Sequence, residues 1–247
     1  MTSLAVDCRI DEHEMLSYLG GLPDVLEESE RARIAGAIAD CQQACTVTGT
    51  YRAFEIAWPG STPVGSDPHA PIHVKSAGME LPGHDIARHL AGAHGVVISV
   101  VTLGLSSEAW LKRQRRRSLE RFVLGDAAAS AYVEAGADAL EASARRAIEG
   151  SRNGRGRLGP RYSPGYGDLP LDVQGPLLAA LDAERLLGIH LTEEGLMIPT
   201  KSITAIAGVF EGTDVDGARD GIGEPCEACP DMGGCSLRRK GRRCYGR

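Results

Sequence analysis

The spacing of apolar positions in the first half of the chain predicts alternating helices and strands. Over residues 11–45, apolar residues recur every three or four positions, which is typical of helices. Residues 46–58 have the β-branched and aromatic content of a strand, and residues 72–81 are expected to form a hairpin with it. A short helix is expected within 82–94. Residues 95–104 are apolar at almost every position, as in a strand that is buried on both faces.

In the second half, the pattern predicts helices separated by loops and then a final strand. Residues 106–148 are helical in pattern, with a break or change of direction expected at 124–126. The polar, glycine-rich stretch 151–160 is interpreted as a linker or flexible loop. A helix over 174–189 and a strand over 202–210 follow. The predicted fold class is therefore α+β, with helices packed on a twisted, mainly antiparallel sheet.

Composition narrows the possible partners and location. The chain has 247 residues, 43% of them hydrophobic, which is enough to bury a substantial core. A net charge of −6 argues against a nucleic-acid partner, because such binding usually begins with a basic surface. The N-terminus lacks a secretory signal, and the longest apolar run, 95–105, is shorter than the roughly 20 residues that span a bilayer. We therefore expect a cytoplasmic protein with no membrane partner.

The C-terminal segment 211–247 is low in apolar residues and holds four of the seven cysteines. A reducing compartment disfavours disulfides, and thiolates that are close in sequence can bind zinc or an iron–sulfur cluster. Spacing does not separate zinc from iron–sulfur, and it also allows free thiols or a redox-active dithiol pair. The sequence thus predicts a metal-binding appendage whose candidate ligands are Cys226, Cys229, Cys235 and Cys244.

The sequence RYSPGYGDLPL, residues 161–171, combines a cation, hydroxyl groups, glycines and prolines. Prolines fix the backbone in advance and glycines allow a ligand to approach it closely. Arg161 could bind a carboxylate through two parallel hydrogen bonds. Composition alone leaves two interpretations, a rigid connector with packed tyrosines or a pre-shaped binding loop.

The residues that follow this stretch carry a resemblance to a known family. An arginine, a proline-containing triplet and Gly-Tyr precede a helix, a Leu-Thr-Glu segment, a Met-x-Pro and a strand. This order resembles the C-terminal reactivation domain of cobalamin-dependent methionine synthase, and small free-standing relatives of it that also have a cysteine-rich tail. The matching positions after the loop are Gly188, Leu191, Thr192, Glu193, Met197, Pro199 and Ser202.

The resemblance implies a domain division and a fold. Residues 1–210 would form a domain like the methionine synthase activation domain, with an N-terminal part, 1–150, and a loop and helix–strand part, 151–210. Residues 211–247 would form the cysteine-rich, metal-binding tail.

The resemblance also implies that the loop binds S-adenosylmethionine (AdoMet). Arg161 would pair with the methionine carboxylate, the backbone around Ser163 and Gly165 would contact the adenosyl part, and Tyr166 would line the site. Glu134, in the alanine-rich helix, would lie near the cationic groups of the ligand; it could instead be an exposed helical carboxylate. The family has a glutamate shortly before the arginine, where residues 152–160 of this chain are rich in basic residues and glycines and include no acidic residue.

The function implied is support of the reductive methylation, or reactivation, of a cobalamin. The chain has no DxHxxG signature, so the cobalamin would be carried by a partner corrinoid protein or by methionine synthase, with a flavodoxin-type protein as the reductant. The chain would then be a component of a cobalamin-dependent methyltransferase system. Two different functions also fit the sequence, an electron-transfer protein that uses the cysteine cluster and a methyltransferase component that takes a methyl group from a corrinoid protein.

The sequence LKRQRRRSLER, residues 111–121, contains six basic residues. Its spacing distributes the charges around a helix, which is typical of a solvated face. A functional interpretation is docking of an acidic partner protein, since complementary charge speeds encounter.

Overall fold

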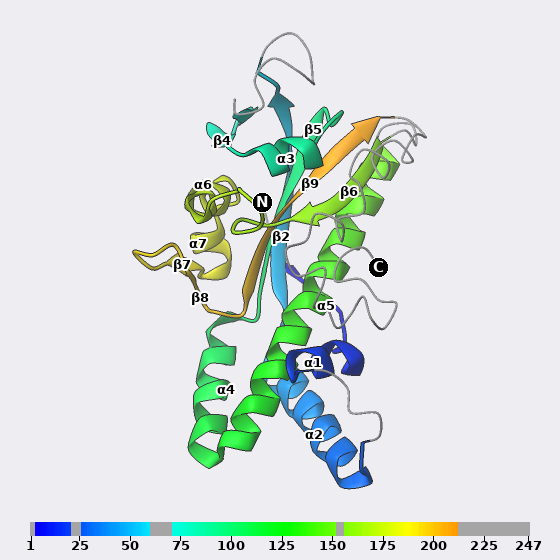
Figure 1. Ribbon diagram of the computed structural model, residues 1–247, viewed down its shortest axis with the longest axis vertical. Helices are drawn as coiled ribbons and strands as arrows, with labels where there is room; N and C mark the ends of the chain where they lie inside the picture. The colour runs from blue at the N-terminus through cyan, green and yellow to red at the C-terminus, as the bar shows by residue number, and fades with distance from the viewer. Residues whose placement is uncertain (1–2, 21–25, 60–70, 152–155, 212–247) are drawn as a thin grey trace.

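An antiparallel sheet with helices on both faces forms the centre of the molecule (Figure 1). The computed structural model describes residues 3–20, 26–59, 71–151 and 156–211. The strand order is β4-β3-β2-β5-β9-β6, and β1 pairs with the start of β2. The strands are β1 Leu4–Ala5, β2 Thr48–Ala57, β3 Ile72–Val74, β4 Met79–Leu81, β5 Gly95–Thr102, β6 Gly156–Tyr162 and β9 Ser202–Glu211.

The longest helix, α5, runs along one face of this sheet, and the small helices α6 and α7 lie on the other side of it (Figure 1). A hairpin of two very short strands, β7 His190–Leu191 and β8 Met197–Ile198, projects beyond α7. The helices are α1 Glu12–Tyr18, α2 Glu28–Ala44, α3 His84–His89, α4 Gly104–Arg117, α5 Leu119–Ser151, α6 Gln174–Ala180 and α7 Ala183–Leu187. Among these described helices, none combines the length and apolarity that a bilayer crossing requires.

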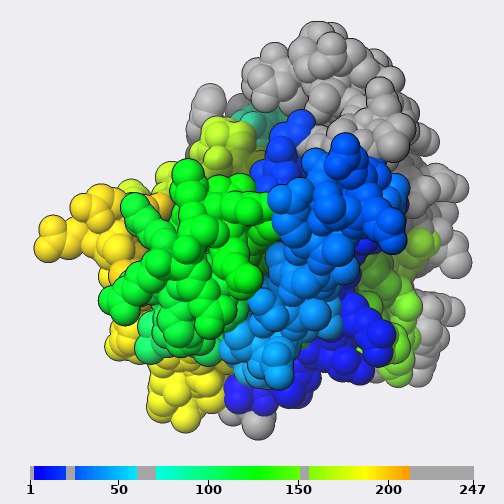
Figure 2. Space-filling view, turned by 90° about the horizontal axis from the view of Figure 1, so that it is seen from below, coloured from blue at the N-terminus to red at the C-terminus, as the bar shows by residue number. Residues whose placement is uncertain are grey.

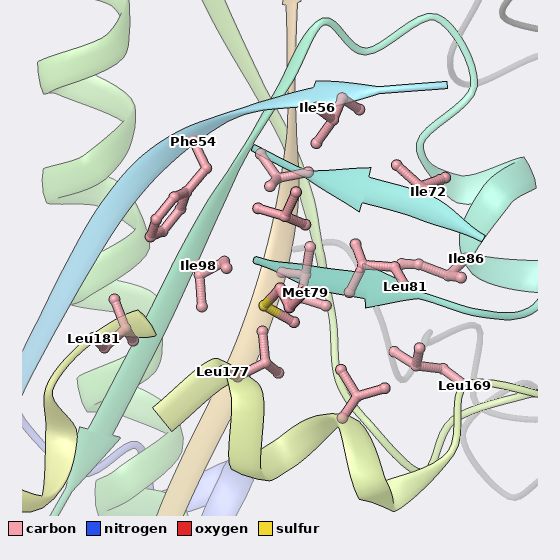
Figure 3. Close-up of a cluster of buried hydrophobic side chains, with 14 of the residues drawn as sticks. Phe54, Ile56, Ile72, Met79, Leu81, Ile86, Ile98, Leu169, Leu177 and Leu181 are labelled. Atoms are coloured by element: carbon pink, nitrogen blue, oxygen red, sulfur yellow. The ribbon is translucent and has the colours of Figure 1, made fainter. Parts of the chain in front are cut away.

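Strand β5 divides the core into two sides, as its largely apolar sequence predicts. Val96, Ile98 and Val100 point into a cluster with β3, β4, α3, α6 and α7 (Figure 3). Val97 and Val101 point the other way, toward the small residues of α5. Because successive side chains of a strand alternate between faces, one strand contributes to both layers. The prediction of an α+β fold with an antiparallel sheet is confirmed.

The expected helix break at 124–126 is wrong, because the chain turns at Ser118 instead. Ser118 has an extended backbone, and its hydroxyl accepts a hydrogen bond from the N–H of Arg121 at 3.1 Å, which caps the start of α5. Gly125 lies inside α5, where a Cβ atom would be 3.0 Å from the Trp110 ring. This glycine therefore permits close packing of α4 on α5 and does not end a helix.

The interpretation of 151–160 as a linker or flexible loop is also wrong for its second half, because β6 begins at Gly156. Strand β6 is at the edge of the sheet, and its pairing with β9 shifts register between Leu158 and Arg161. Pro160 lies within this irregular segment, and an edge strand or bulge is where a sheet tolerates proline. The glycines and the proline of this segment suggested a loop, whereas the segment forms β6, which carries Arg161 near its end.

Two smaller predictions are refined. Residues 72–81 do pair with β2, but they form two short strands, β3 and β4, joined by a turn. The helix expected over 174–189 is divided into α6 and α7 at Asp182, whose φ is 53°. The proposed division into 1–210 and 211–247 stays a prediction, because residues 212–247 lie outside the described part.

Candidate functional site

Arg161 connects the edge of the sheet to helix α5. It pairs with Ala207 of β9 in the sheet register, and its side chain reaches three carboxylates on α5. The Nη2 atom lies 2.6 Å from Asp138 Oδ1 and 3.7 Å from Glu134 Oε2, and Nε lies 3.4 Å from Glu141 Oε2. The side chain is only 22% exposed, so these charges interact with limited screening.

The cluster around Arg161 carries more negative than positive charge. Glu141 is shared with Arg145, whose Nη2 lies 2.7 Å from Glu141 Oε1, while Arg145 Nη1 donates to the carbonyl of Leu158. Three carboxylates thus face two guanidinium groups. In addition, the buried Nη1 of Arg161 has no hydrogen-bond partner among the residues that the structure describes. A buried donor that is left unpaired is costly, and it marks a place where an acceptor could bind.

Glu134 is the carboxylate most affected by this arrangement. Burial raises the pKa of Glu134, Arg161 lowers it, and the negative charges of Asp138 and Glu14 raise it further; the net direction is upward. The carboxylate of Glu134 therefore has less favourable interactions in its charged form than an exposed glutamate has. A ligand cation would relieve this deficit.

The loop that follows β6 has a fixed backbone. The N–H of Gly165 donates to the carbonyl of Leu169 at 2.9 Å, and the N–H of Leu169 donates to the carbonyl of Tyr166 at 3.1 Å. The hydroxyl of Tyr162 also donates to the carbonyl of Tyr166, at 3.1 Å. Gly165, with φ of 89°, adopts a backbone conformation that favours glycine. The loop is therefore shaped before any ligand binds.

Asp168 ties this loop to helix α3. Its carboxylate accepts hydrogen bonds from the backbone N–H groups of His84, at 2.6 Å, and Asp85, at 3.0 Å. Gly167, at φ 52°, sits so close to Asp85 and the Tyr162 hydroxyl that a side chain there would collide with both. These contacts leave the ring of Tyr166 on the surface, 68% exposed.

Tyr18, at the end of α1, lies in the electrostatic field of the same site. Burial raises the pKa of the Tyr18 hydroxyl, and the charges of Glu134 and Glu14 and the hydroxyl of Tyr166 raise it further. The ring nevertheless remains 47% exposed. Two partly exposed tyrosines, from α1 and from the loop, thus accompany the Glu134 carboxylate.

The structure brings the predicted residues Arg161 and Glu134 to within 3.7 Å of each other. Ser163, Gly165 and Tyr166 follow directly in the loop, where the carbonyl of Ser163 accepts a hydrogen bond from the N–H of Tyr166 at 3.2 Å.

Sequence reasoning missed Asp138, Glu141 and Tyr18. The two carboxylates are four and seven positions after Glu134, the spacing that places residues on one helix face, so a signal was present. Tyr18 lies in MLSYLG, a segment in the part of the chain where the family resemblance is looser.

The predicted metal ligands Cys226, Cys229, Cys235 and Cys244 lie outside the described residues, so the metal site stays a prediction. Within the described ranges, no group of three or more histidine, cysteine, aspartate or glutamate side chains is arranged so that it could hold a metal ion. Cys8, Cys41 and Cys45 are free thiols.

Comparison with known proteins identifies the architecture. No family model and no curated protein sequence matches the chain. A crystal structure of the MetH reactivation domain bound to AdoHcy matches with a TM-score of 0.61 and 16% sequence identity, over 98% of this chain and 86% of that one. The chain has the fold of the MetH reactivation domain. The resemblance inferred from the residues after Arg161 is thus confirmed at the level of the fold.

Proposed function

We propose that this protein binds AdoMet between helix α5 and the loop 163–167, and presents its methyl group to a cobalamin on a partner protein. The observation that carries the proposal is the charge arrangement at Arg161, where excess carboxylates and one unpaired guanidinium nitrogen lie beside a pre-shaped loop. The shared fold supports it, since the matching MetH domain is bound to AdoHcy.

The charges of AdoMet complement those of the site. AdoMet carries a carboxylate, an ammonium and a sulfonium group, so it has one positive charge in excess. The cluster of Glu134, Asp138, Glu141, Arg145 and Arg161 has one negative charge in excess when all five are ionised. Binding would therefore neutralise a local imbalance, which is favourable in a partly buried site.

Each part of the ligand has a corresponding group. The ligand carboxylate would bind the unpaired Nη1 of Arg161, and the ammonium would bind Asp138. Asp138 would thereby replace the glutamate that the family has shortly before the arginine and that this chain lacks. Glu134 and the exposed ring of Tyr166 would stabilise the sulfonium group, through opposite charge and a cation–π contact.

The loop would hold the adenosyl part. The backbone around Ser163 and Gly165 is accessible and fixed by its internal hydrogen bonds, so that little conformational entropy is lost on binding. The role of this chain is accordingly positional, since it holds the methyl donor and its charge in one orientation.

Cobalamin on the partner would supply a cobalt centre that, after one-electron reduction by a flavodoxin-type protein, accepts the methyl group as the S–CH3 bond breaks and AdoHcy leaves. The chain's own contribution is to keep the sulfonium near Glu134 until transfer. After transfer the sulfur is neutral, so the attraction to Glu134 weakens and product release becomes easier.

Equilibrium binding of AdoMet tests the proposal. The wild type should bind with a Kd in the micromolar to millimolar range, and Arg161→Ala should bind at least about tenfold more weakly, because it loses a charge-assisted hydrogen bond. Arg185→Ala, which removes an exposed arginine of α7, is the matched control and should bind as the wild type does. Lack of wild-type binding at millimolar AdoMet would contradict the proposed function, and unchanged binding by Arg161→Ala would contradict the role given to that residue.

A further inference from the structure

The turn from α4 to α5 lies beside α2 (Figure 2). It carries a second group of charged residues, which precede along the chain the α5 residues that contact Arg161. We call this group the arginine face. It consists of Arg113, Arg115, Arg116, Arg117 and Arg121, all of them exposed. In a protein with a net charge of −6, this concentration of positive charge needs its own explanation.

Among the described residues, none of these five guanidinium groups has a hydrogen bond or ion pair; Arg115 lies over the Phe122 ring at 5.6 Å. Elsewhere, Arg88, Arg145 and Arg185 each have a carboxylate within 2.8 Å. Among the residues that the structure describes, the arginine face is therefore not neutralised by ion pairs.

Helix electrostatics do not account for the whole face. Arg115, Arg116 and Arg117 in the last turn of α4 are favoured by the negative end of the helix dipole. Arg121 lies in the first turn of α5, where a positive charge is disfavoured, and Arg113 lies more than a turn before the end of α4. The arrangement is thus not what helix stability alone would select.

A hollow of about 310 Å³ opens at the edge of this face. Trp110 and Gln114 are only 4% and 6% exposed, and both line the hollow, so the indole N–H and the side-chain amide are candidate donors to a group that enters it. These donors would suit an anionic group. The lining residues are Asp40, Gln43 and Ala44 of α2 and Trp110, Arg113, Gln114 and Arg117 of α4.

Two exposed apolar side chains adjoin the arginines. Leu119 is 74% exposed and Val123 is 44% exposed. Apolar residues and arginines together are typical of protein interfaces, whereas two aliphatic side chains offer little area for insertion into a bilayer. The net negative charge of the chain disfavours nucleic acid as the occupant.

From these observations we infer that the arginine face is a docking surface for an acidic protein, one of whose aspartate or glutamate side chains enters the hollow between α2 and α4. The arginines would accelerate encounter and fix orientation, and the donors of Trp110 and Gln114 would bind the inserted carboxylate. This inference does not depend on AdoMet binding.

The test uses a labelled helical peptide with leucines on one face and glutamates on the other as a stand-in for the acidic partner. Fluorescence anisotropy should show saturable binding at low salt that weakens as salt is raised. The double variant Arg113→Gln/Arg117→Gln should raise the Kd at low salt at least about tenfold, because it removes two charges that attract the acidic peptide. Arg185→Gln, an exposed arginine outside the face, is the control and should leave the Kd unchanged.

A second measurement reports on the hollow itself. The chain has two tryptophans, Trp58 and Trp110, so Trp58→Phe leaves Trp110 as the only indole. Its emission should change as the peptide binds, and free glutamate should not reproduce the change at the same concentration.

Four outcomes would overturn the inference: no peptide binding at millimolar concentration, unchanged affinity in the double variant, binding only of single-stranded RNA or of phosphatidylglycerol vesicles, or equal saturation of the Trp110 signal by free glutamate.

Discussion

Lys201, just before β9, and Arg161, near the end of β6, both contact α5, and their surroundings differ. Lys201 Nζ lies 2.8 Å from Asp126 Oδ1 and 2.8 Å from Ser130 Oγ, so one cation meets one carboxylate and one hydroxyl. Arg161 meets three carboxylates and keeps one buried nitrogen without a partner in the described part of the chain. The contacted side chains are spaced by three or four residues along α5 and form one stripe: Asp126, Ser130, Glu134, Asp138 and Glu141.

This difference indicates that the Lys201 contact is structural and that the Arg161 region is a candidate ligand site. Next to Lys201, Thr200 donates its N–H and hydroxyl to Glu108 at 2.8 and 2.7 Å, so this region satisfies its own polar groups. A folded protein retains an imbalance such as that at Arg161 where something other than stability is selected, and ligand binding is the common reason. The same helix stripe thus serves as an anchor at one end and as a candidate ligand site further along.

Removing the charge of Lys201 should have the largest effect on stability. Lys201→Met keeps most of the side-chain length but removes the cation that pairs with Asp126 and donates to Ser130, which should lower the free energy of unfolding by about 2 kcal/mol. Urea denaturation measures this. Arg185→Met, at an exposed pair, should cost less than about 0.5 kcal/mol. Equal costs for the two variants would show that the Lys201 contact is not structural.

The contributions of Glu134 and Glu108 to stability should depend on pH in opposite directions. The pKa of Glu134 is raised above its ordinary value of 4.5, so its contribution to stability is present at low pH and is lost as pH rises through the folded-state pKa. Glu134→Gln should therefore become more stable relative to wild type between about pH 4 and about pH 7, by less than about 1 kcal/mol given the partial exposure.

Burial raises the pKa of Glu108, but the hydrogen bonds from Thr200 and the charges of Lys112 and Lys201 lower it more, so that the net pKa lies below 4.5. Its contribution is present above that value and is lost as pH falls through the folded-state pKa. Glu108→Gln should be destabilised near neutral pH, and the difference should shrink on acidification. Melting temperatures of wild type and both variants across this pH range test these predictions. If the difference from wild type changes with pH in the same direction for both variants, the opposite roles of Glu134 and Glu108 are contradicted.

A smaller effect is expected at the loop. Tyr166→Ala should weaken AdoMet binding about threefold, and Tyr166→Phe should retain it, because the proposed contact uses the face of the ring and not the hydroxyl. Equilibrium dialysis of the two variants measures this difference. Equal losses in both variants would assign the role to the hydroxyl instead.

The sequence predicted the regular elements well where the local pattern and tertiary packing agree. The largely apolar β5 is buried on both faces, and the order of residues after Arg161 pointed to the correct fold. It failed where a residue's role is set by a distant partner. Gly125 suggested a helix break, but it lies inside α5 and allows Trp110 to pack closely. Pro160 suggested a loop, but it lies in an edge strand whose irregular register accommodates a proline.

The candidate site was predicted only in part, for a similar reason. Arg161 and Glu134 could be named from the sequence, and the structure places them together. That Asp138 and Glu141 also face Arg161 depends on how α5 lies across β6, which local sequence does not specify. The charge imbalance, on which the proposed function rests, is therefore a tertiary property.

The most direct test of this imbalance is the ratio of the Kd values for AdoHcy and AdoMet, because AdoHcy lacks the sulfonium charge. Wild type should favour AdoMet about fivefold, close to 1 kcal/mol, and Glu134→Gln should reduce the ratio toward one. Asp126→Asn neutralises a carboxylate on the same stripe beside Lys201 and should leave the ratio unchanged. Calorimetric titrations that show full selectivity in Glu134→Gln, or an equal loss in Asp126→Asn, would contradict the assignment of the Arg161 region as the site for a cationic ligand.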